Sequence, residues 1–208
     1  MSEAKKVFLF GYSGHAYVII ESLLDAGYAI AGYFDKAEAE FNPYNLPYFG
    51  FEKEVDVRCI VGDRLVFPSI GDNSIRENLI DFFNSFALKQ FVLKDPSAVV
   101  SSTATLGVST YVGKGVLVNA QSIIGGGVIL NSGSIVEHEC KLGDFVHIAP
   151  GAVLCGNVKI GNGSFIGANS VVRENNSVVG GALIGAGSVV TKNITKNGIW
   201  FGNPVRKI

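Results

Sequence analysis

An aliphatic residue returns every six positions through the second half of this 208-residue chain. A period of six matches neither the 3.6-residue turn of an α-helix nor the two-residue alternation of a half-buried strand. It predicts a short strand and a turn that repeat along the chain. In steps of six from Val100, all sixteen positions hold leucine, isoleucine or valine: Val100, Leu106, Val112, Val118, Ile124, Leu130, Val136, Leu142, Ile148, Leu154, Ile160, Ile166, Val172, Val178, Ile184 and Val190.

Three hexapeptides of this kind close one triangular coil, with an aliphatic side chain inside each face. Small residues such as Ser122, Cys140 and Ala152 stand two positions before the aliphatic and are expected near the corners. The run from about residue 96 to 192 provides five coils and a little more. Stacked coils bury a continuous aliphatic column, so each coil depends on its neighbours. This half is therefore predicted to be an all-β parallel helix, which its resemblance to known hexapeptide proteins makes left-handed.

The first ninety or so residues alternate between strand and helix patterns, which predicts an α/β domain with a small parallel sheet of Rossmann-like type. Asn73 or Ser74 is expected to cap the second helix. The expected elements are strands at 6–10, 28–34, 57–61 and 65–70, and helices at 16–26 and about 73–86. The predicted domains are the α/β domain at 1–94, the β-helix at 95–192 and a C-terminal tail at 193–208.

Composition argues against several classes of protein. A net charge of -1 and a pI near 6.3 disfavour a nucleic-acid binder. No apolar run is long enough to span a bilayer, and the N-terminus lacks the pattern of a signal peptide, so we expect no membrane insertion. The three cysteines, Cys59, Cys140 and Cys155, form no close pair in sequence, so no disulfide framework or zinc knuckle is indicated. Free thiols suit a reducing cytosol, and we predict a cytoplasmic protein.

The turn GYSGH at 11–15 stands between the first predicted strand and helix. Backbone N–H groups and the helix dipole at such a turn can receive a phosphate. Asp35 ends the second predicted strand, where folds of this type often hold a ribose hydroxyl. The turn lacks the full GxGxxG pattern of dinucleotide redox enzymes. A nucleotide without redox chemistry is therefore predicted, although a plain tight turn would explain GYSGH equally well.

Two of the three histidines lie on the predicted coils, nine residues apart. His138 stands near a corner in the segment VEHEC, and His147 directly precedes the core residue Ile148, so both are expected to face outward toward solvent or a neighbouring subunit. A neutral imidazole suits a general base because its pKa lies near the working pH. A lone exposed histidine without any catalytic role is the plainer alternative.

An adjacent carboxylate could hold the second imidazole nitrogen and stabilise the imidazolium. Glu137 and Glu139 are both candidates. Consecutive strand residues point to opposite faces, so Glu139 can reach His138 only if a corner bends the chain between them. An oxyanion formed in acyl transfer would need a donor, for which a backbone N–H or His147 is available.

Several motifs cover nearly the whole chain: FGYSGHAYVIIESLLDAGY, SIGDNSIR, VEHEC with a histidine nine residues on, and the tail GIWFGNPVRKI. On these motifs the chain resembles the sugar acetyltransferases related to sialic-acid O-acetyltransferase. It is most similar to their branch that acetylates the 4-amino group of UDP- or dTDP-linked amino-sugars for glycans such as bacillosamine. The resemblance implies an N-acetyltransferase that uses acetyl-CoA and acts on the C4 amino group of a nucleotide-sugar.

The resemblance also assigns roles on the coils. His138 corresponds to the general base, and Glu139 to the carboxylate that raises its basicity. His147 corresponds to a residue that contacts the acetyl group of acetyl-CoA. Ala168 and Ala186 match backbone positions along the groove for the pantetheine arm. No metal is implied.

In the N-terminal domain the resemblance assigns contacts to the nucleotide-sugar. Lys36 departs from the family pattern, in which a second acidic residue often stands at this position. The implied contacts are Ser13, Gly14 and His15 in the nucleotide-sugar loop, Asp35 and Lys36 at the base or ribose, and Gly71 in SIGDN.

A homotrimer is implied as well, with acetyl-CoA between adjacent β-helices. Phe145 and Phe165 on the coils would be exposed in a monomer, which agrees with burial in a threefold ring. Arg206 and Lys207 in the tail either contact CoA phosphates or form a solvated basic end.

Three other functions remain open on the sequence. A sugar O-acetyltransferase of the sialic-acid type would use the same base and donor. A zinc enzyme like the γ-type carbonic anhydrases needs three histidines at subunit interfaces, whereas two lie on the coils. A nonenzymatic β-helix is the third.

Overall fold

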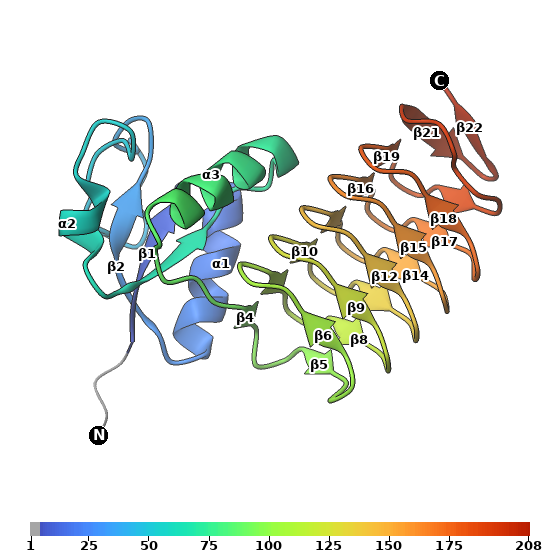
Figure 1. Cartoon of the computed structure of the whole chain (residues 1–208), viewed down its shortest axis with the longest axis horizontal. Helices are drawn as coiled ribbons and strands as arrows, with labels where there is room; N and C mark the ends of the chain where they lie inside the picture. The colour runs from blue at the N-terminus through green and yellow to red at the C-terminus, as the bar shows by residue number, and fades with distance from the viewer. Residues whose placement is uncertain (1–4) are drawn as a thin grey trace.

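The computed structural model describes residues 5–208, so the first four residues of the predicted N-terminal domain lie outside it. An α/β domain stands at one end of a long β-solenoid, and a hairpin closes the other end (Figure 1). The predicted fold class is confirmed in both halves.

The N-terminal sheet has three parallel strands in the order β2-β1-β3. Its central strand β1 has the sequence KVFLF, and every residue after Lys6 is buried. Val7 and Leu9 pack on α1, whereas Phe8 and Phe10 pack on α2 and α3, as the two-residue alternation of a strand requires. The elements are β1 (Lys6–Phe10), α1 (Gly14–Asp25), β2 (Ala29–Phe34), α2 (Val57–Val61), β3 (Leu65–Pro68) and α3 (Asn73–Ser85).

Two local predictions in this domain are wrong. The expected strand at 57–61 is the short helix α2, because Val57 and Val61 share a helical face and are buried while Arg58 and Cys59 are exposed. Helix α3 is capped by Asp72 instead of Asn73 or Ser74. The Asp72 carboxylate accepts a hydrogen bond from the backbone N–H of Ile75, at 2.9 Å.

The solenoid is built from three parallel sheets, one for each face of the triangle (Figure 1). The first sheet contains β4 (Leu93–Lys94), β7 (Tyr111–Val112), β10 (Ile129–Leu130), β13 (His147–Ile148), β16 (Phe165–Ile166), β19 (Leu183–Ile184), β21 (Ile199–Gly202) and the antiparallel β22 (Val205–Lys207). The second contains β5 (Val99–Val100), β8 (Leu117–Val118), β11 (Ile135–Val136), β14 (Val153–Leu154), β17 (Val171–Val172) and β20 (Val189–Val190). The third contains β6 (Thr105–Leu106), β9 (Ile123–Ile124), β12 (Lys141–Leu142), β15 (Lys159–Ile160) and β18 (Ser177–Val178).

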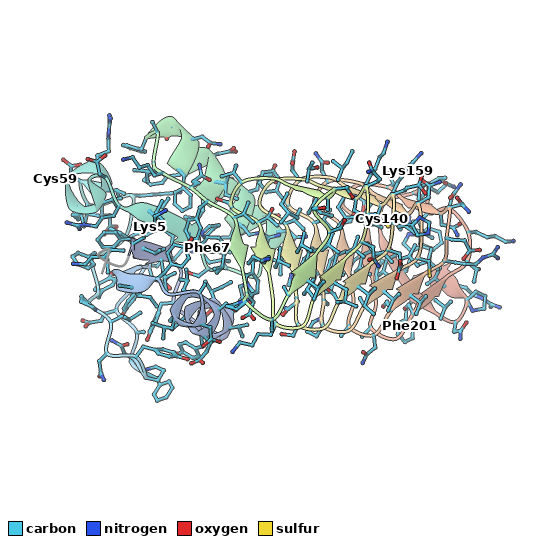
Figure 2. All side chains as sticks on the ribbon, turned by 90° about the horizontal axis from the view of Figure 1, so that it is seen from below. Lys5, Cys59, Phe67, Cys140, Lys159 and Phe201 are labelled. Carbon is cyan, nitrogen blue, oxygen red and sulfur yellow. The ribbon has the colours of Figure 1, made fainter. Side chains whose placement is uncertain are left out.

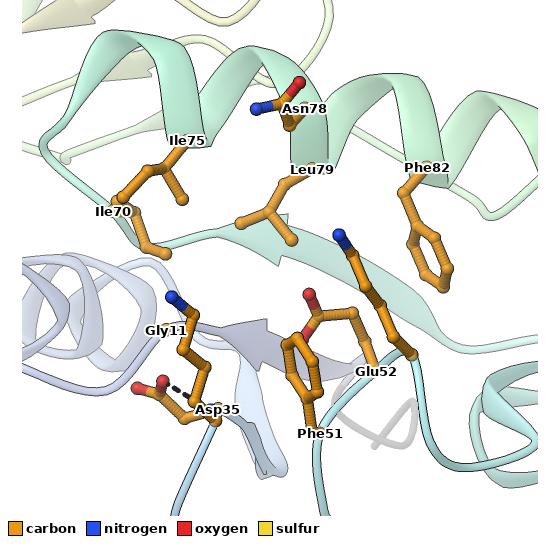
Figure 3. Close-up of a pocket in the computed structure, with 11 residues that line it drawn as sticks. Gly11, Asp35, Phe51, Glu52, Ile70, Ile75, Asn78, Leu79 and Phe82 are labelled. Carbon is orange, nitrogen blue, oxygen red and sulfur yellow. Dashed lines mark hydrogen bonds between the residues drawn. The ribbon is translucent and has the colours of Figure 1, made fainter.

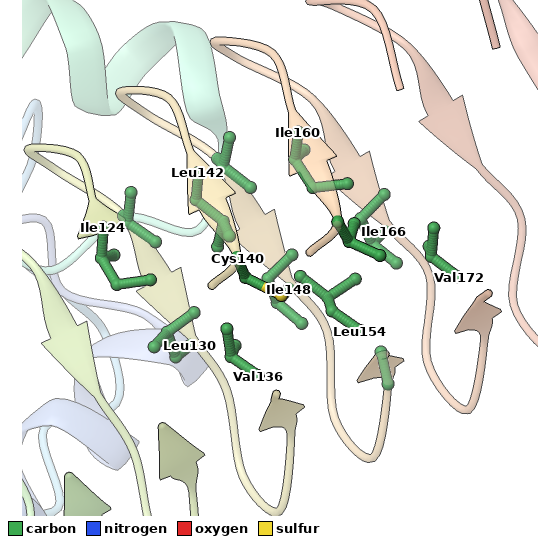
Figure 4. Close-up of a cluster of buried hydrophobic side chains, with 14 of the residues drawn as sticks. Ile124, Leu130, Val136, Cys140, Leu142, Ile148, Leu154, Ile160, Ile166 and Val172 are labelled. Carbon is green, nitrogen blue, oxygen red and sulfur yellow. The ribbon is translucent and has the colours of Figure 1, made fainter. Parts of the chain in front are cut away.

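The aliphatic residues of the six-residue repeat form the predicted interior column (Figure 4). In the third sheet, for example, Leu142 pairs with Ile124 below and Ile160 above. The small residues lie buried at the corners, where several satisfy backbone groups. The hydroxyl of Ser122 donates to the carbonyl of Glu137, and Cys140 Sγ donates to that of Cys155. The small size and the hydrogen bond together explain the residue type at this position.

The N-terminal domain packs directly onto the first sheet of the solenoid. Tyr111 and Ile129 belong to the same buried cluster as helix α1. The hydroxyl of Ser22 donates to Asp95 Oδ2 at 2.6 Å and lies 2.8 Å from the Tyr111 hydroxyl, so a buried polar contact also joins the two parts. The solenoid and the α/β domain are therefore held in a fixed relation.

This packing overturns the argument that two phenylalanines mark a trimer interface. Phe145 packs against the α2–α3 cluster of its own chain. The Phe165 ring lies against the ring of His147, with 4.9 Å between centroids. Both side chains are partly buried by contacts within the chain, so neither needs a second subunit to cover it.

Candidate functional site

The GYSGH turn lies at the carboxyl end of β1 and leads into α1. Ser13 occupies the N-cap position of α1 with an extended backbone, but its side chain makes no capping hydrogen bond. Helices α2 and α3 are both capped by an aspartate. The exposed Ser13 and Gly14 thus leave the first N–H groups of α1 open, which is the arrangement that binds an anion.

Asp35 at the end of β2 is tied to this turn. Its carboxylate accepts hydrogen bonds from the backbone N–H groups of Tyr12, at 2.8 Å, and of Lys36, at 2.7 Å. Gly11 has a φ of +98°, and a Cβ there would collide with Ile70 Cγ1, so only glycine fits. Asp35, Lys36 and Gly11 line one side of a pocket of about 190 Å³ that α3 closes on the other side (Figure 3).

A buried arginine joins the SIGDN turn to the solenoid. Arg76 is 1% exposed and donates to the carbonyls of Gly71 and Ile70 in its own domain. It also donates to the carbonyls of Gly127, at 2.6 Å, and Phe145, at 3.0 Å, on the coils. Burial lowers the pKa of this guanidinium to about 10, so it stays charged at neutral pH. Arg76 therefore fixes Gly71 relative to the coils.

His15 and His147, which lie far apart in sequence, meet beside Gly71. Their ring centroids are 6.3 Å apart. Burial, followed by the positive charge of Arg76, lowers the pKa of each imidazole to about 4. Both rings are therefore neutral at pH 7.

His147 does not face solvent or a neighbouring subunit as expected from the sequence. It points outward from its coil, but the N-terminal domain of the same chain covers it and leaves it 8% exposed. Its Nδ1 lies 3.2 Å from the carbonyl oxygen of Gly71, which can only accept, so Nδ1 carries the proton. Nε2 of the neutral ring is then an acceptor and faces the amide of Asn131 at 3.4 Å. In this arrangement His147 has no proton to donate to an oxyanion.

His138 and Glu139 stand on the corner between the second and third sheets. Glu139 has a left-handed backbone with a φ of +62°, which supplies the bend that the pairing requires. His138 Nδ1 lies 3.0 Å from Glu139 Oε2, and both side chains are more than half exposed, at 59% and 64%. The carboxylate can therefore hold the Nδ1 proton and leave Nε2 free as a base.

The His138 ring also packs over Gly156 in the next coil. A Cβ at Gly156 would lie 2.5 Å from His138 Cε1 and 2.6 Å from its Nε2. The absence of a side chain at this corner thus leaves the space that the ring occupies.

The predicted site residues fall into three groups in a single chain. Ser13, His15, Asp35, Gly71 and their neighbours gather with His147 beside the first sheet. His138 and Glu139 lie at the corner between the second and third sheets. Ala168 and Ala186 lie one above the other at the corner between the first and second sheets, where Ala168 accepts a hydrogen bond from Gly187. The last two groups therefore lie at the two corners that flank the second sheet, one where its strands begin and one where they end.

Sequence reasoning missed three contributors to these sites. One sequence feature could have identified Arg76. It stands three and four positions before the apolar Leu79 and Ile80 on a helix, which places it on their buried face. Glu52, which lines the pocket at Asp35, lies in a loop without any pattern. Gly156 follows the repeat like other glycines, so only the three-dimensional contact with His138 identifies it.

Among residues 5–208, no group of three or more histidine, cysteine or acidic side chains is arranged to hold a metal ion. The helices of this described part are too short or too polar to cross a bilayer.

Comparison with protein families gives two matches. The family described as the PglD N-terminal domain matches residues 6–83. The family described as bacterial transferase hexapeptide, with six repeats, matches residues 139–174. A comparison with curated proteins gave no match.

Solved structures resemble the chain over its whole length. The acetyltransferase domain of PglB from Neisseria gonorrhoeae is 30% identical, with a TM-score of 0.90 over 98% of this chain and 100% of that one. The same domain has been solved with acetyl coenzyme A. PerB from Caulobacter crescentus, in complex with CoA and GDP-perosamine, is 32% identical, with a TM-score of 0.91 over 97% of this chain and 96% of that one. WeeI from Acinetobacter baumannii, at 20% identity, shares the fold with a TM-score of 0.82. The chain therefore belongs to the hexapeptide-repeat acetyltransferases that carry a PglD-type N-terminal domain.

Proposed function

We propose that this chain transfers the acetyl group of acetyl-CoA to the C4 amino group of a nucleotide-linked amino-sugar. The observation that carries the proposal is the His138–Glu139 pair, with 3.0 Å between Nδ1 and Oε2 on an outer corner of the solenoid. The relatives support the two substrates, because one was solved with acetyl coenzyme A and another with CoA and GDP-perosamine.

His138 acts as the general base of this transfer. The amine nitrogen attacks the thioester carbonyl carbon while its proton passes to His138 Nε2. Glu139 accepts the hydrogen bond from Nδ1 and stabilises the imidazolium that forms. The C–S bond then breaks, and the imidazolium returns the proton to the CoA thiolate as it leaves. No covalent enzyme intermediate is needed.

The nucleotide binds at the N-terminal domain. Its diphosphate lies at the open N-terminus of α1, beside Ser13, Gly14 and His15. Asp35 and Lys36 contact the nucleoside in the neighbouring pocket, and the sugar extends toward Gly71. His147 and His15, both neutral, give this region polar groups without adding charge.

The active form is a homotrimer in which each site combines two subunits. Within one chain the base and the nucleotide turn lie on different sides of the solenoid, so a second copy has to bring them together. The outward side of the second sheet supports such an assembly because it carries one aliphatic residue per coil. This second-sheet stripe consists of Val99, Leu117, Ile135, Val153, Val171 and Val189, with Val99 64% and Leu117 38% exposed. Acetyl-CoA would lie along the edge of this interface, near Ala168 and Ala186.

Replacement of the base tests the proposed chemistry. We expect His138→Ala to lower kcat by about 10²- to 10⁴-fold with acetyl-CoA and a nucleotide-linked 4-amino-sugar, because general-base assistance is lost. CoA release measured with a thiol reagent, together with mass analysis of the sugar, gives the rate and the product. A variant with full turnover would exclude His138 as the base.

The acceptor is tested with matched substrates. A nucleotide-linked sugar with a hydroxyl in place of the C4 amine should not compete as an acceptor. Preferred acetylation of that hydroxyl would replace the N-acetyltransferase with the O-acetyltransferase alternative.

A further inference from the structure

The pocket beside Asp35 has three sides, all formed by the N-terminal domain. Gly11 and Asp35 form its floor at the ends of β1 and β2, and Ile75 and Leu79 of α3 form an apolar wall (Figure 3). The loop that carries Phe51 and Glu52 closes the third side, and both side chains point into the pocket. Because Gly11 also begins the GYSGH turn, the pocket adjoins the turn that leads into α1.

The two carboxylates of this pocket differ in what they already bind. Asp35 accepts two backbone hydrogen bonds, from Tyr12 and Lys36. Glu52 is half-buried and, within residues 5–208, forms no salt bridge. Burial raises the pKa of its carboxyl, and a hydrogen bond from its own backbone N–H offsets this only in part. Glu52 is therefore the carboxylate of the pocket with the greater acceptor capacity left for a ligand.

The chemistry of the nucleobases decides which of them suits a carboxylate. Guanine presents two adjacent donors, N1–H and the N2 amino group, which match the two oxygens of a carboxylate. Uracil and thymine present a single N3–H between two carbonyl oxygens, which a carboxylate repels. Adenine and cytosine present one amino donor next to an unprotonated ring nitrogen. The flat ring of Phe51 and the apolar wall of α3 can pack on the faces of a purine.

We propose that Glu52 selects guanine, so that the acceptor is a sugar linked to guanosine diphosphate. This inference rests on the proposed function, since it specifies the nucleotide of the same substrate. The carboxylate of Glu52 accepts from N1–H and the N2 amino group, while Lys36 and Lys53 at the pocket balance its charge. Glu52 is a specificity-determining residue and takes no part in acetyl transfer.

Binding of free nucleoside diphosphates to the full-length protein tests the selection. Isothermal titration calorimetry with GDP, UDP, dTDP and ADP should give a dissociation constant for GDP at least about tenfold lower than for the others, as expected for one or two hydrogen bonds to a charged group. Equal or tighter binding of UDP, dTDP or ADP, or no measurable binding of GDP, would overturn the proposal.

The Glu52→Gln variant separates the carboxylate from the shape of the pocket. Its amide keeps the size of the side chain but directs N–H groups at one guanine donor, so GDP should bind about 10- to 100-fold more weakly. UDP should bind equally well or more tightly, because an amide complements the edge of uracil. Glu54→Gln is the matched control, since Glu54 is exposed and does not line the pocket, and it should change neither constant. Unchanged GDP binding in Glu52→Gln contradicts the proposal.

These titrations require no catalysis, so the two proposals fail separately. Selective GDP binding without acetylation of any GDP-linked amino-sugar would leave the role of Glu52 intact and exclude the proposed activity. Acetylation of a UDP-linked amino-sugar by a protein that does not prefer GDP would do the reverse.

Discussion

The ring of His138 depends on the residue one coil above it. Gly156 leaves the space in which the imidazole lies, and Glu139 orients the ring through Nδ1 from a left-handed corner position. In the proposed role of general base, His138 has to meet its substrate within hydrogen-bonding distance, so a small displacement of the ring would have a large effect on the rate.

We predict that Gly156→Ala lowers kcat by about 10- to 100-fold, because the new Cβ displaces the His138 ring. The unfolding temperature should change little. Gly126→Ala is the control, since Gly126 holds the same position in its turn and a Cβ there would have its nearest contact at 3.4 Å. Steady-state kinetics and thermal unfolding of both variants check this, and equal activity of the two would disprove a positioning role for Gly156.

The neutral state of His15 and His147 links stability to pH. Both have a folded-state pKa of about 4 against 6.5 in the unfolded chain, so the unfolded state binds more protons between these values. The contribution of the two neutral rings to the free energy of unfolding is fully present above about pH 6.5. It is lost as the pH falls toward about 4, at up to about 1.4 kcal/mol per pH unit for each histidine. Urea unfolding at a series of pH values should show this slope, and His147→Gln should reduce it. A wild-type stability that stays flat over this window would contradict the assignment.

At the level of secondary-structure elements, the three helices of the N-terminal domain differ in how their first turns are capped. Asp56 and Asp72 cap α2 and α3 through hydrogen bonds to backbone N–H groups. Helix α1 has Ser13 at this position without any side-chain bond. A carboxylate at Ser13 would satisfy the helix but would also repel a phosphate, which gives a physical reason for the open end.

Ser13→Asp should therefore raise the stability of the protein and weaken its binding of a nucleoside diphosphate. The new cap stabilises α1 by about 0.5–1 kcal/mol. The same charge weakens nucleoside diphosphate binding by about tenfold or more through repulsion of the phosphates. Thermal unfolding and calorimetric titration measure the two effects, and Ser13→Ala, which removes no capping bond, serves as the control. Unimpaired binding in Ser13→Asp would place the diphosphate elsewhere.

For the molecule as a whole, the division of the site is the main consequence of the fold. The proposed nucleotide turn and His147 lie with the first sheet, and His138, the proposed base, lies across the solenoid. Lys159 of the third sheet and Phe201 of β21, in the first sheet, project from opposite sides of the solenoid (Figure 2). The third sheet presents Lys141 and Lys159 outward, whereas the second-sheet stripe is aliphatic in every coil.

We expect Ile135→Lys, in the middle of the second-sheet stripe, to convert the proposed trimer to a monomer and to abolish turnover. A buried lysine without a partner strongly disfavours the interface. Ile123→Lys places the same charge on the third sheet, which already exposes lysines, and should leave the trimer intact. Sedimentation velocity and kinetics distinguish the outcomes. If each site takes its two halves from different subunits, co-refolding His138→Ala with Ser13→Asp should restore about a quarter of the sites, measured at a nucleotide-sugar concentration too low to occupy the Ser13→Asp variant. No recovery, or a wild-type protein that is monomeric, would refute the shared site.

The sequence by itself determined the repeat, the two-part architecture and the identity of the candidate base. A six-residue period is compatible with one kind of coil, and the position of a residue within the repeat determines whether its side chain points inward. The segment 57–61 is too short for its apolar pattern to distinguish a strand from a helix. It was expected to be a strand, although the spacing of Val57 and Val61 also fits one helical turn. Helix caps were similarly uncertain by one or two residues, because Asp72, Asn73 and Ser74 are all suitable in type.

Only the tertiary structure decided how the parts meet. His15, Gly71 and His147 come together because the α/β domain packs on the first sheet, a contact between segments that share no sequence pattern. The same packing covers Phe145 and Phe165, and it lowers the pKa of two histidines that sequence alone would treat as ordinary. Periodicity fixes the direction of a side chain relative to its own coil. What lies opposite that side chain depends on long-range packing, which has no period to detect.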